Sequence, residues 1–362
     1  MIDFSTLQGL TIPEGAVTQI TDASGRVLWK LANDKPIILE VEKITSNTYA
    51  AETTYTGEQF ILLDIYPKTN GTVSVTYGGL TKTITDTSGV AEPNAQQVFF
   101  GTFNGVSDSV STPASGTLII EGDYYAFGCG SFHISSKEYS NTLYNGIIGT
   151  VDVGNSTMIP TNAFGVGAYG CEKMTAVNIS DTVKTIKNWA FANCTGLTSI
   201  YIVAGVESIE SGNVFDGCYK TDIIVDSRNK YYSADGGALF NKNKTTLIAY
   251  PAVGEAYTVP STVTEIGEYA FYELDYTRGI NYTITVPTSV TNIGRYAFNF
   301  SGGGKKLKVR VKMLSTTPPT LGSSAFYDKT GYHEIIVPKG SGAAYKEAEE
   351  WSNYAAFITE ES

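Results

Sequence analysis

The sequence has 362 residues and a formal net charge of −11, and only 17% of its residues are charged. This acidic balance argues against general affinity for nucleic acid or anionic membranes. No apolar run approaches the ~18 residues of a membrane-spanning helix. The 12% of aromatic residues and the 37 glycines favour many short strands and tight turns. The sequence therefore predicts a mainly β protein of two or three domains. It predicts no nucleic-acid partner and no membrane span.

The chain opens with a small separate element over residues 1–33. Residues 17–20 and 26–29 flank a turn that contains Gly25, which is the pattern of a β-hairpin. Residues 1–15 contain neither the basic nor the apolar region of a secretory signal, so the sequence predicts no export by that route. We expect residues 1–33 to act as an anchoring element.

Residues 34–122 predict a β-sandwich of immunoglobulin-like architecture, because several short β-type segments follow one another over about 90 residues. Gly78 and Gly79 supply a hairpin turn between two of them. The Cys…Trp…Cys core of antibody domains is missing, so only the architecture is predicted. Residues 123–140 are rich in Gly, Ser and Tyr and are expected to form a linker. The strand candidates are 37–41, 61–65, 72–77, 80–85, 98–103 and 117–120.

An internal repeat fills the second part of the chain, residues 141–362. Its unit is an aliphatic residue, three variable residues, a small residue and Phe. Successive Phe positions lie about 24 to 31 residues apart, which is within the period of leucine-rich repeats. One copy carries an insertion, and a degenerate copy lies at 237–240. The copies are 159–164, 186–191, 209–215, 266–271, 293–298 and 321–326.

Each copy is accompanied by a short strand with alternating apolar residues, such as 199–203 and 283–287. Alternation puts successive side chains on opposite faces, so one set stacks into the core of a solenoid. The other set lines up from repeat to repeat as one outward surface. The outward set in this prediction is Asn178, Tyr201, Ile224, Thr258, Thr285, Arg310 and Ile336.

Residues 140–362 resemble the BspA-type leucine-rich repeats of bacterial and some protist surface proteins. The resemblance rests on the repeated I-x-x-x-A-F element, on the linkers VTEIGEYAF and VTNIGRYAF, and on the insert at 229–251. It implies a solenoid that binds or adheres, usually without catalysis. It also implies a C-terminal cap with a short helix within 343–351.

The first 120 residues resemble tail-associated minor structural proteins of phages and prophages of Firmicutes. The opening IDFSTLQGLTIPEGAVTQITDASGRVLWK and the segment that begins GTVSVTYGGLTKTIT carry this resemblance. It implies assembly in the host cytoplasm and release by lysis, which agrees with the missing signal peptide.

Four patterns that could carry chemistry have plainer structural explanations. The G-x-G-x-x-G at Gly165 lacks the preceding strand and following helix of a dinucleotide site, so we expect a solenoid turn. The one-per-repeat spacing of Cys171, Cys194 and Cys218 predicts a ladder of buried thiols rather than a tetrahedral metal site. The two histidines, His133 and His333, are 200 residues apart and suggest no triad. Asp226, Asn229 and Asp235 do not have calcium-loop spacing and are expected to be turn residues. We therefore predict no enzyme activity, no metal and no cofactor.

A local basic stripe stands out on this acidic chain, because Lys308, Arg310 and Lys312 share the outward face of one strand. It is either a solvated strand face or a contact for an anionic polymer. The many tyrosines of the repeats offer rigid amphipathic surface for packing or for recognition. The complete predicted binding set is Asn178, Tyr201, Ile224, Thr258, Thr285, Lys308, Arg310, Lys312 and Ile336.

These features lead to three hypotheses about function. The first is a non-enzymatic phage or prophage tail protein, located in the virion, whose repeats bind a glycan or protein receptor on the host cell. Its N-terminal region would hold other tail proteins, and a homo-oligomer is left open. The second is a bacterial surface or secreted adhesin with the same repeats. The third is a tail-borne glycan hydrolase, for which no carboxylate pair can be nominated.

Overall fold

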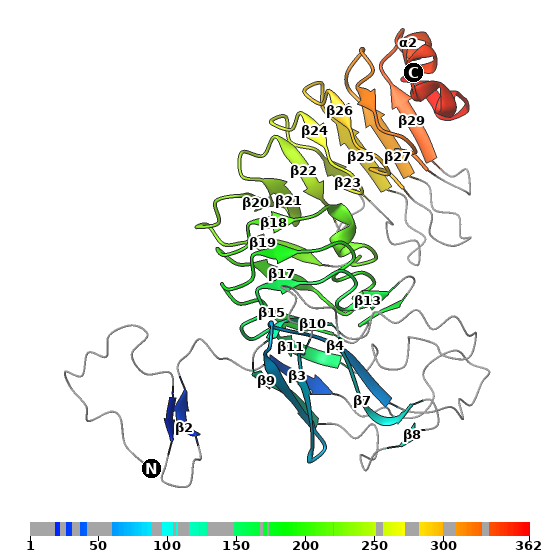
Figure 1. The fold of residues 1–362 in the computed structure, drawn as a ribbon. Helices are drawn as coiled ribbons and strands as arrows, with labels where there is room; N and C mark the ends of the chain where they lie inside the picture. Colours follow the sequence, from blue (N-terminus) through cyan, green and yellow to red (C-terminus); the bar gives the residue numbers. More distant parts are fainter. Residues whose placement is uncertain are drawn as a thin grey trace, which may run out of the picture.

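The computed structural model describes a mainly β chain that runs from an N-terminal β unit into a solenoid and ends in a short helical cap (Figure 1). A separate hairpin of β1 (Gln19–Thr21) and β2 (Val27–Lys30) lies at the N-terminal end, as predicted. The described residues are 19–21, 27–30, 37–41, 60–87, 96–103, 106–107, 116–122, 124–128, 148–166, 169–171, 174–219, 221–250, 256–271, 282–299, 309–327 and 333–362.

The N-terminal β unit contains two sheets that share one hydrophobic core. The order of the smaller sheet is β10-β4-β7-β8, and β3, β9, β5 and β6 form one end of the larger sheet. All six predicted strands are confirmed, but Tyr124–Gly128, inside the expected linker, is a strand that pairs with β4. An immunoglobulin-like sandwich is not shown by this arrangement. The bounds are β3 Ile37–Val41, β4 Phe60–Pro67, β5 Thr72–Tyr77, β6 Leu80–Thr85, β7 Gln96–Phe103, β8 Val106–Ser107, β9 Gly116–Gly122 and β10 Tyr124–Gly128.

The larger sheet continues directly into the solenoid. β3 pairs antiparallel with β11 (Ile148–Asp152), and β11 pairs parallel with β15 (Ala176–Asn178), the next rung. The smaller sheet contributes Phe127, whose ring meets Phe164 of the first repeat edge-on at 5.7 Å. Solenoids need a terminal element that covers the first rung, and the N-terminal β unit therefore caps this one.

The solenoid has strands of three to five residues on one face, called the longer strands here, and on the other face strands of two residues, apart from the four-residue β22 and the insert hairpin. On each face the rungs within a sheet are mostly parallel neighbours, because the chain makes one circuit per repeat. The longer strands are β17 Ser199–Ile202, β19 Asp222–Val225, β23 Ala256–Thr258, β25 Tyr282–Val286, β27 Val309–Met313 and β29 His333–Val337. The short strands are β12 Met158–Ile159, β16 Thr185–Ile186, β18 Ser208–Ile209, β22 Thr246–Ala249, β24 Glu265–Ile266, β26 Asn292–Ile293 and β28 Thr320–Leu321.

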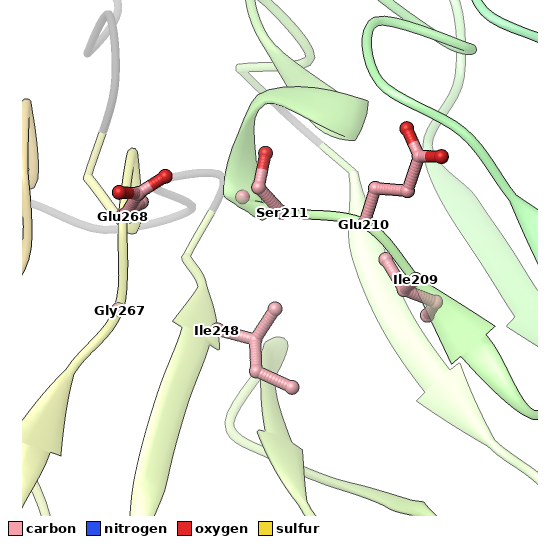
Figure 2. Close-up of a pocket in the computed structure, with 7 residues that line it drawn as sticks. Ile209, Glu210, Ser211, Ile248, Gly267 and Glu268 are labelled. Carbon is pink, nitrogen blue, oxygen red and sulfur yellow. The ribbon is translucent and has the colours of Figure 1, made fainter.

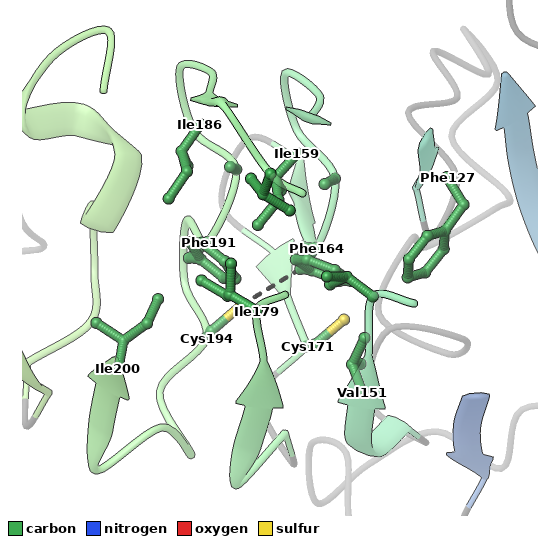
Figure 3. Close-up of a cluster of buried hydrophobic side chains, with 14 of the residues drawn as sticks. Phe127, Val151, Ile159, Phe164, Cys171, Ile179, Ile186, Phe191, Cys194 and Ile200 are labelled. Carbon is green, nitrogen blue, oxygen red and sulfur yellow. Dashed lines mark hydrogen bonds between the residues drawn. The ribbon is translucent and has the colours of Figure 1, made fainter. Parts of the chain in front are cut away.

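The repeated Phe forms a stacked column inside the solenoid. Ring centroids of Phe164 and Phe191 are 5.3 Å apart, and those of Phe271 and Phe298 are 5.0 Å apart. The Ala that precedes Phe is buried in each of these copies. Its small side chain leaves room for the turn of the next repeat. Figure 3 shows the first rings of the column between the aliphatic residues Ile159, Ile186 and Ile179.

A second column runs beside the first and consists of the predicted thiols Cys171, Cys194 and Cys218, all of which are buried. The Cys218 thiol donates a hydrogen bond to the Phe191 carbonyl at 2.9 Å, and Cys194 does the same to Phe164 at 3.6 Å (Figure 3). Burial, together with the neighbouring Cys194, raises the pKa of the Cys218 thiol well above its usual range. The ladder of buried thiols predicted from the spacing is confirmed.

We expect Cys171, Cys194 and Cys218 to resist a thiol reagent such as DTNB in the folded chain and to react together after unfolding in guanidinium. Only the thiolate attacks the reagent, and burial suppresses both its formation and its accessibility. Thiol titration followed by peptide mapping measures this. Labelling of these three peptides without denaturant would contradict the expectation.

Gly165 and Gly170 of the G-x-G-x-x-G pattern serve packing, and Gly167 lies outside the described residues. β13 (Gly165–Val166) and β14 (Tyr169–Gly170) form a small hairpin, with Gly165 opposite Gly170. A Cβ on Gly165 would lie 1.9 Å from the Ala192 carbonyl oxygen, and one on Gly170 would lie 2.3 Å from the same atom. The hairpin can lie this close to the next repeat only because it lacks these side chains.

The insert at 229–251 separates two hydrophobic cores of the solenoid. β20 (Tyr232–Asp235) and β21 (Ala238–Asn241) form a hairpin that pairs with β22. Along β21 the side chains alternate, with Leu239 in the first core and Phe240 in the second. The 3-10 helix η3 (Gly212–Phe215) follows β18, which is the last strand of its sheet among the described residues. The Tyr232 hydroxyl accepts the Ile209 N–H at 2.7 Å.

The C-terminal cap contains α2 (Gly342–Glu347), η5 (Trp351–Phe357) and a last strand, β30 (Ile358–Glu360), that pairs with β29. The helix was predicted, whereas the added strand was not. Trp351 is fully buried, contacts the ring of Phe326 at 5.5 Å and donates to the Pro319 carbonyl at 2.7 Å. The Glu360 carboxylate accepts the N–H groups of Gly340 and Gly342, which lowers its pKa.

Candidate binding face

The structure places the described members of the predicted binding set on the outward face of the longer strands, but in two separate groups. Among the described residues β19 does not pair with β23, and the β20–β21 hairpin separates the two strands in the sequence. Lys308 lies outside the described residues, as do residues 1–18, most of the expected linker, Cys129 and His133. The first group is Asn178, Tyr201 and Ile224, and the second is Thr258, Thr285, Arg310, Lys312 and Ile336.

In the second group, each described cation of the basic stripe has a carboxylate partner. The Arg310 guanidinium bonds Glu334 on the next strand at 3.0 Å, and the Lys312 ammonium pairs with Glu361 after β30. Thr258, Thr285, Lys312 and Ile336 follow one another in a single row. Since these cations are compensated across the repeats, the stripe offers an anionic polymer less net positive charge than the sequence of the strand suggests.

In the first group, Tyr201 and Ile224 lie directly opposite each other on β17 and β19. Both side chains are large and 47% exposed. Asn178 lies on β15, and its amide donates to Asp152 at 2.8 Å. An exposed aromatic and aliphatic pair on a rigid sheet is the strongest binding feature among the predicted positions.

Asp226, which the sequence predicts to be a turn residue, and Arg228, for which it made no prediction, lie beside this pair. The carboxylate of Asp226 accepts the backbone N–H and Nε of Arg228 at 2.8 and 3.1 Å, and its second oxygen accepts Nη2 at 2.7 Å. The Asp226 backbone N–H donates to the carbonyl of Ile202, the residue after Tyr201, at 2.9 Å. The calcium-loop pattern is thus a turn, as expected. The sequence signal that could have identified this arrangement is the Asp-x-Arg spacing directly after a strand, since the neighbouring strand carries an outward Tyr.

The bonds from Arg228 hold the pKa of the Asp226 carboxyl well below its ordinary value of 3.8. A lowered pKa in the folded state stabilises the fold above the ordinary value, and this contribution disappears as the pH falls through the lowered pKa. We expect a carboxyl NMR titration to show Asp226 still ionised below pH 3.8. In Arg228→Ala the titration should move back towards the ordinary value, and an unchanged titration would contradict the assigned cause.

A pocket of about 260 Å³ opens on the other face, at the break between β18 and β22. Its lining is Ile209, Glu210, Ser211, Gly212, Ile248, Gly267 and Glu268. Figure 2 shows Ile248 directed into it and the Glu210 carboxylate directed away. That carboxylate accepts the Asn188 N–H at 2.9 Å. None of the predicted binding residues lines this pocket.

The turns before the Ala-Phe pairs carry strained aromatic residues. Trp189, Tyr269 and Tyr296 have φ values of 54°, 58° and 53°, in the left-handed region that bulky residues seldom adopt. The rings of Tyr269 and Tyr296 stack at 5.3 Å, and the Arg295 guanidinium lies 5.1 Å from the Tyr296 ring. The rings of Tyr269 and Tyr296 cover each other, which indicates a packing role on the turn side of the solenoid, whereas Trp189 is exposed.

Among the described residues, no group of three or more His, Cys, Asp and Glu side chains is placed to hold a metal ion. The same part of the chain contains no helix that is both long and apolar enough to cross a membrane.

Stacked parallel rungs, a buried Phe in each repeat and covered ends define a leucine-rich-repeat solenoid. A family model for the BspA type leucine rich repeat region, with six copies, matches residues 155–252 and 254–349, which is more than half of the chain. The chain therefore belongs to the BspA-type leucine-rich repeat family.

Solved structures give more distant likenesses. A leucine rich cell surface protein from Faecalibacterium prausnitzii is 23% identical with a TM-score of 0.41, over 60% of this chain and 61% of its own. This chain thus spans less than two thirds of that protein. A leucine-rich repeat protein from Eubacterium ventriosum is 19% identical with a TM-score of 0.31, over 53% and 75% of the two chains. The pneumococcal vaccine antigen PcpA is 16% identical with a TM-score of 0.29, over 56% and 65%. A search of curated proteins finds no match.

Proposed function

We propose that this protein is a non-enzymatic adhesin of the cell surface or extracellular space, and that the outward face of its solenoid binds a partner. The observation that supports this most is the exposed Tyr201–Ile224 pair on the rigid sheet of a BspA-type solenoid. Repeat solenoids present extended surfaces of this kind for binding. The N-terminal β unit holds the first rung in place and extends the same sheet.

A binding assay with the full chain tests this proposal. Fluorescently labelled protein is added to a panel of bacterial and epithelial cells, and unlabelled protein is used as competitor. The proposal expects saturable binding that the competitor displaces. Binding to none of the cells, or binding that does not saturate, would overturn it.

A phage or prophage tail protein is the second candidate, and the resemblance of the opening residues to tail-associated proteins favours it. Both candidates use the solenoid for binding. They differ in whether a cell surface or a phage particle carries the solenoid. Antibody labelling of intact producing cells and of purified phage particles separates them. Label on washed cells supports the adhesin, whereas label confined to particles supports the tail protein. For the tail protein we also expect an immunoglobulin-like N-terminal module and contacts with other tail proteins.

A further inference from the structure

The Tyr201–Ile224 pair has the properties of a preorganised contact centre. Arg228 is fixed by three hydrogen bonds to Asp226, yet its side chain is 72% exposed, whereas that of Asp226 is 8% exposed. Tyr201 lies beside Asp226, whose backbone N–H donates to the Ile202 carbonyl at 2.9 Å. Binding usually costs the ordering of flexible side chains, and for Arg228 that ordering is already present in the unbound protein. Tyr and Arg are also the residues that most often dominate protein interfaces.

The charge around this centre is negative. Asp226 and Arg228 cancel each other, and three further carboxylates remain against one lysine, Lys242, whose ammonium donates to the Ser227 and Asn229 carbonyls. Asp181 is close enough to act on both Tyr201 and Arg228. Asp222 is exposed on the same face, two residues before Ile224, and Asp152 lies beside Asn178. The nearby Lys184 is engaged with Glu207 at 3.2 Å. A partner with positive charge around its contact would therefore complement this surface.

The Ile224 side chain favours a polypeptide over a sugar, whereas the ring and hydroxyl of Tyr201 suit either ligand. Ile224 has neither a hydrogen-bonding group nor a flat ring to place against a pyranose, whereas a branched aliphatic side chain packs well against another apolar side chain. The opposite surface chemistry, an anionic polymer held by the basic stripe, is disfavoured because Glu334 and Glu361 already pair with its described cations.

We infer that Tyr201, Ile224 and Arg228 form a docking site for a protein partner that presents an apolar side chain within a basic segment. This inference rests on the proposed function, since it names the class of partner that the outward face binds. It places recognition in the first half of the solenoid, before the β20–β21 hairpin.

Fluorescence anisotropy with synthetic peptides tests the site on the full chain. The probes are a peptide of alternating Lys and Leu, one of alternating Glu and Leu, one of alternating Lys and Ser, and soluble polyphosphate. The Lys–Leu peptide should bind most tightly, and its affinity should fall as NaCl screens the aspartates. Tyr201→Ala and Ile224→Ser should each weaken it about tenfold or more. Asp226→Asn should weaken it by releasing Arg228.

The matched control is Leu314→Ser, an equally apolar and 41% exposed position outside the site, which should bind like the unsubstituted chain. The Tyr201, Ile224 and Leu314 variants change exposed side chains, and melting temperatures check that these variants and Asp226→Asn fold. Equal affinity of Ile224→Ser and Leu314→Ser, or tighter binding of the Glu–Leu peptide or polyphosphate, would overturn the inference. The same variants in the cell assay distinguish failure of the docking site from failure of the proposed function. If the unsubstituted chain binds cells and Ile224→Ser binds them equally, the site is wrong and adhesion stands, whereas absence of cell binding overturns the proposed function alone.

Discussion

A chain that lacks residues 1–147 will not fold into a soluble monomer, although it retains every repeat. Removing the N-terminal β unit takes away β3, the antiparallel partner of β11, and exposes the backbone of that strand as a new sheet edge. It also takes away Phe127 and uncovers Phe164 and Val151, which are 1% and 3% exposed in the whole chain. Each large side chain returned to water costs about 1.5–3 kcal/mol, and an uncovered apolar edge promotes aggregation.

Size-exclusion chromatography and thermal unfolding of residues 148–362 measure this effect. The matched control is residues 34–362, which lack only the β1–β2 hairpin. In the described residues these two strands pair only with each other, so the control should remain monomeric with an unchanged melting temperature. A monomeric 148–362 fragment with a sharp unfolding transition would show that the β unit is a separate domain rather than a cap.

Phe298→Ala should destabilise the protein by about 3–5 kcal/mol, the usual cost of truncating a buried Phe. The Phe298 ring is fully buried and stacks between Phe271 at 5.0 Å and Phe326 at 4.9 Å, so its loss removes contacts with two neighbouring repeats. The neighbouring rings cannot close the gap, because each is held by its own turn. Guanidinium unfolding monitored by circular dichroism gives the free energy.

Leu314→Ala is the control for Phe298→Ala, because Leu314 is 41% exposed and its truncation should change stability by less than about 0.5 kcal/mol. Phe298→Leu should fall between the two variants. A loss below about 1 kcal/mol in Phe298→Ala would mean that the column of rings is not a main source of stability.

Local sequence patterns predicted most of this fold, because each repeat makes its main contacts with the next one. The copies of the Ala-Phe element and the alternating strands identified the solenoid, its inward residues and its outward face. The pairing of β3 with β11 could not be predicted, because it joins residues more than 100 positions apart and has no period. β10 was missed for a related reason, since its Tyr124–Gly128 sequence becomes a strand only beside β4.

The candidate site was predicted in part. Alternation identified Tyr201 and Ile224 as outward residues, and their exposure agrees. The compensation of Arg310 and Lys312 was not predictable from their own strand, because Glu334 and Glu361 belong to later circuits of the chain. Asp226 and Arg228 are close in sequence, but their place beside Tyr201 depends on the pairing of β17 with β19.

The separation of the two cores by the 229–251 insert affects how the molecule unfolds locally. In repeat proteins, cooperativity passes from each repeat to the next through shared contacts, and a weak junction divides the chain into foldons. β21 contributes Leu239 to one core and Phe240 to the other, and neither sheet continues across this position in the described residues. Native-state hydrogen exchange should therefore resolve two foldons that meet at β21. The docking site would belong to the foldon that contains the N-terminal β unit, so fraying of the C-terminal circuits would leave it intact.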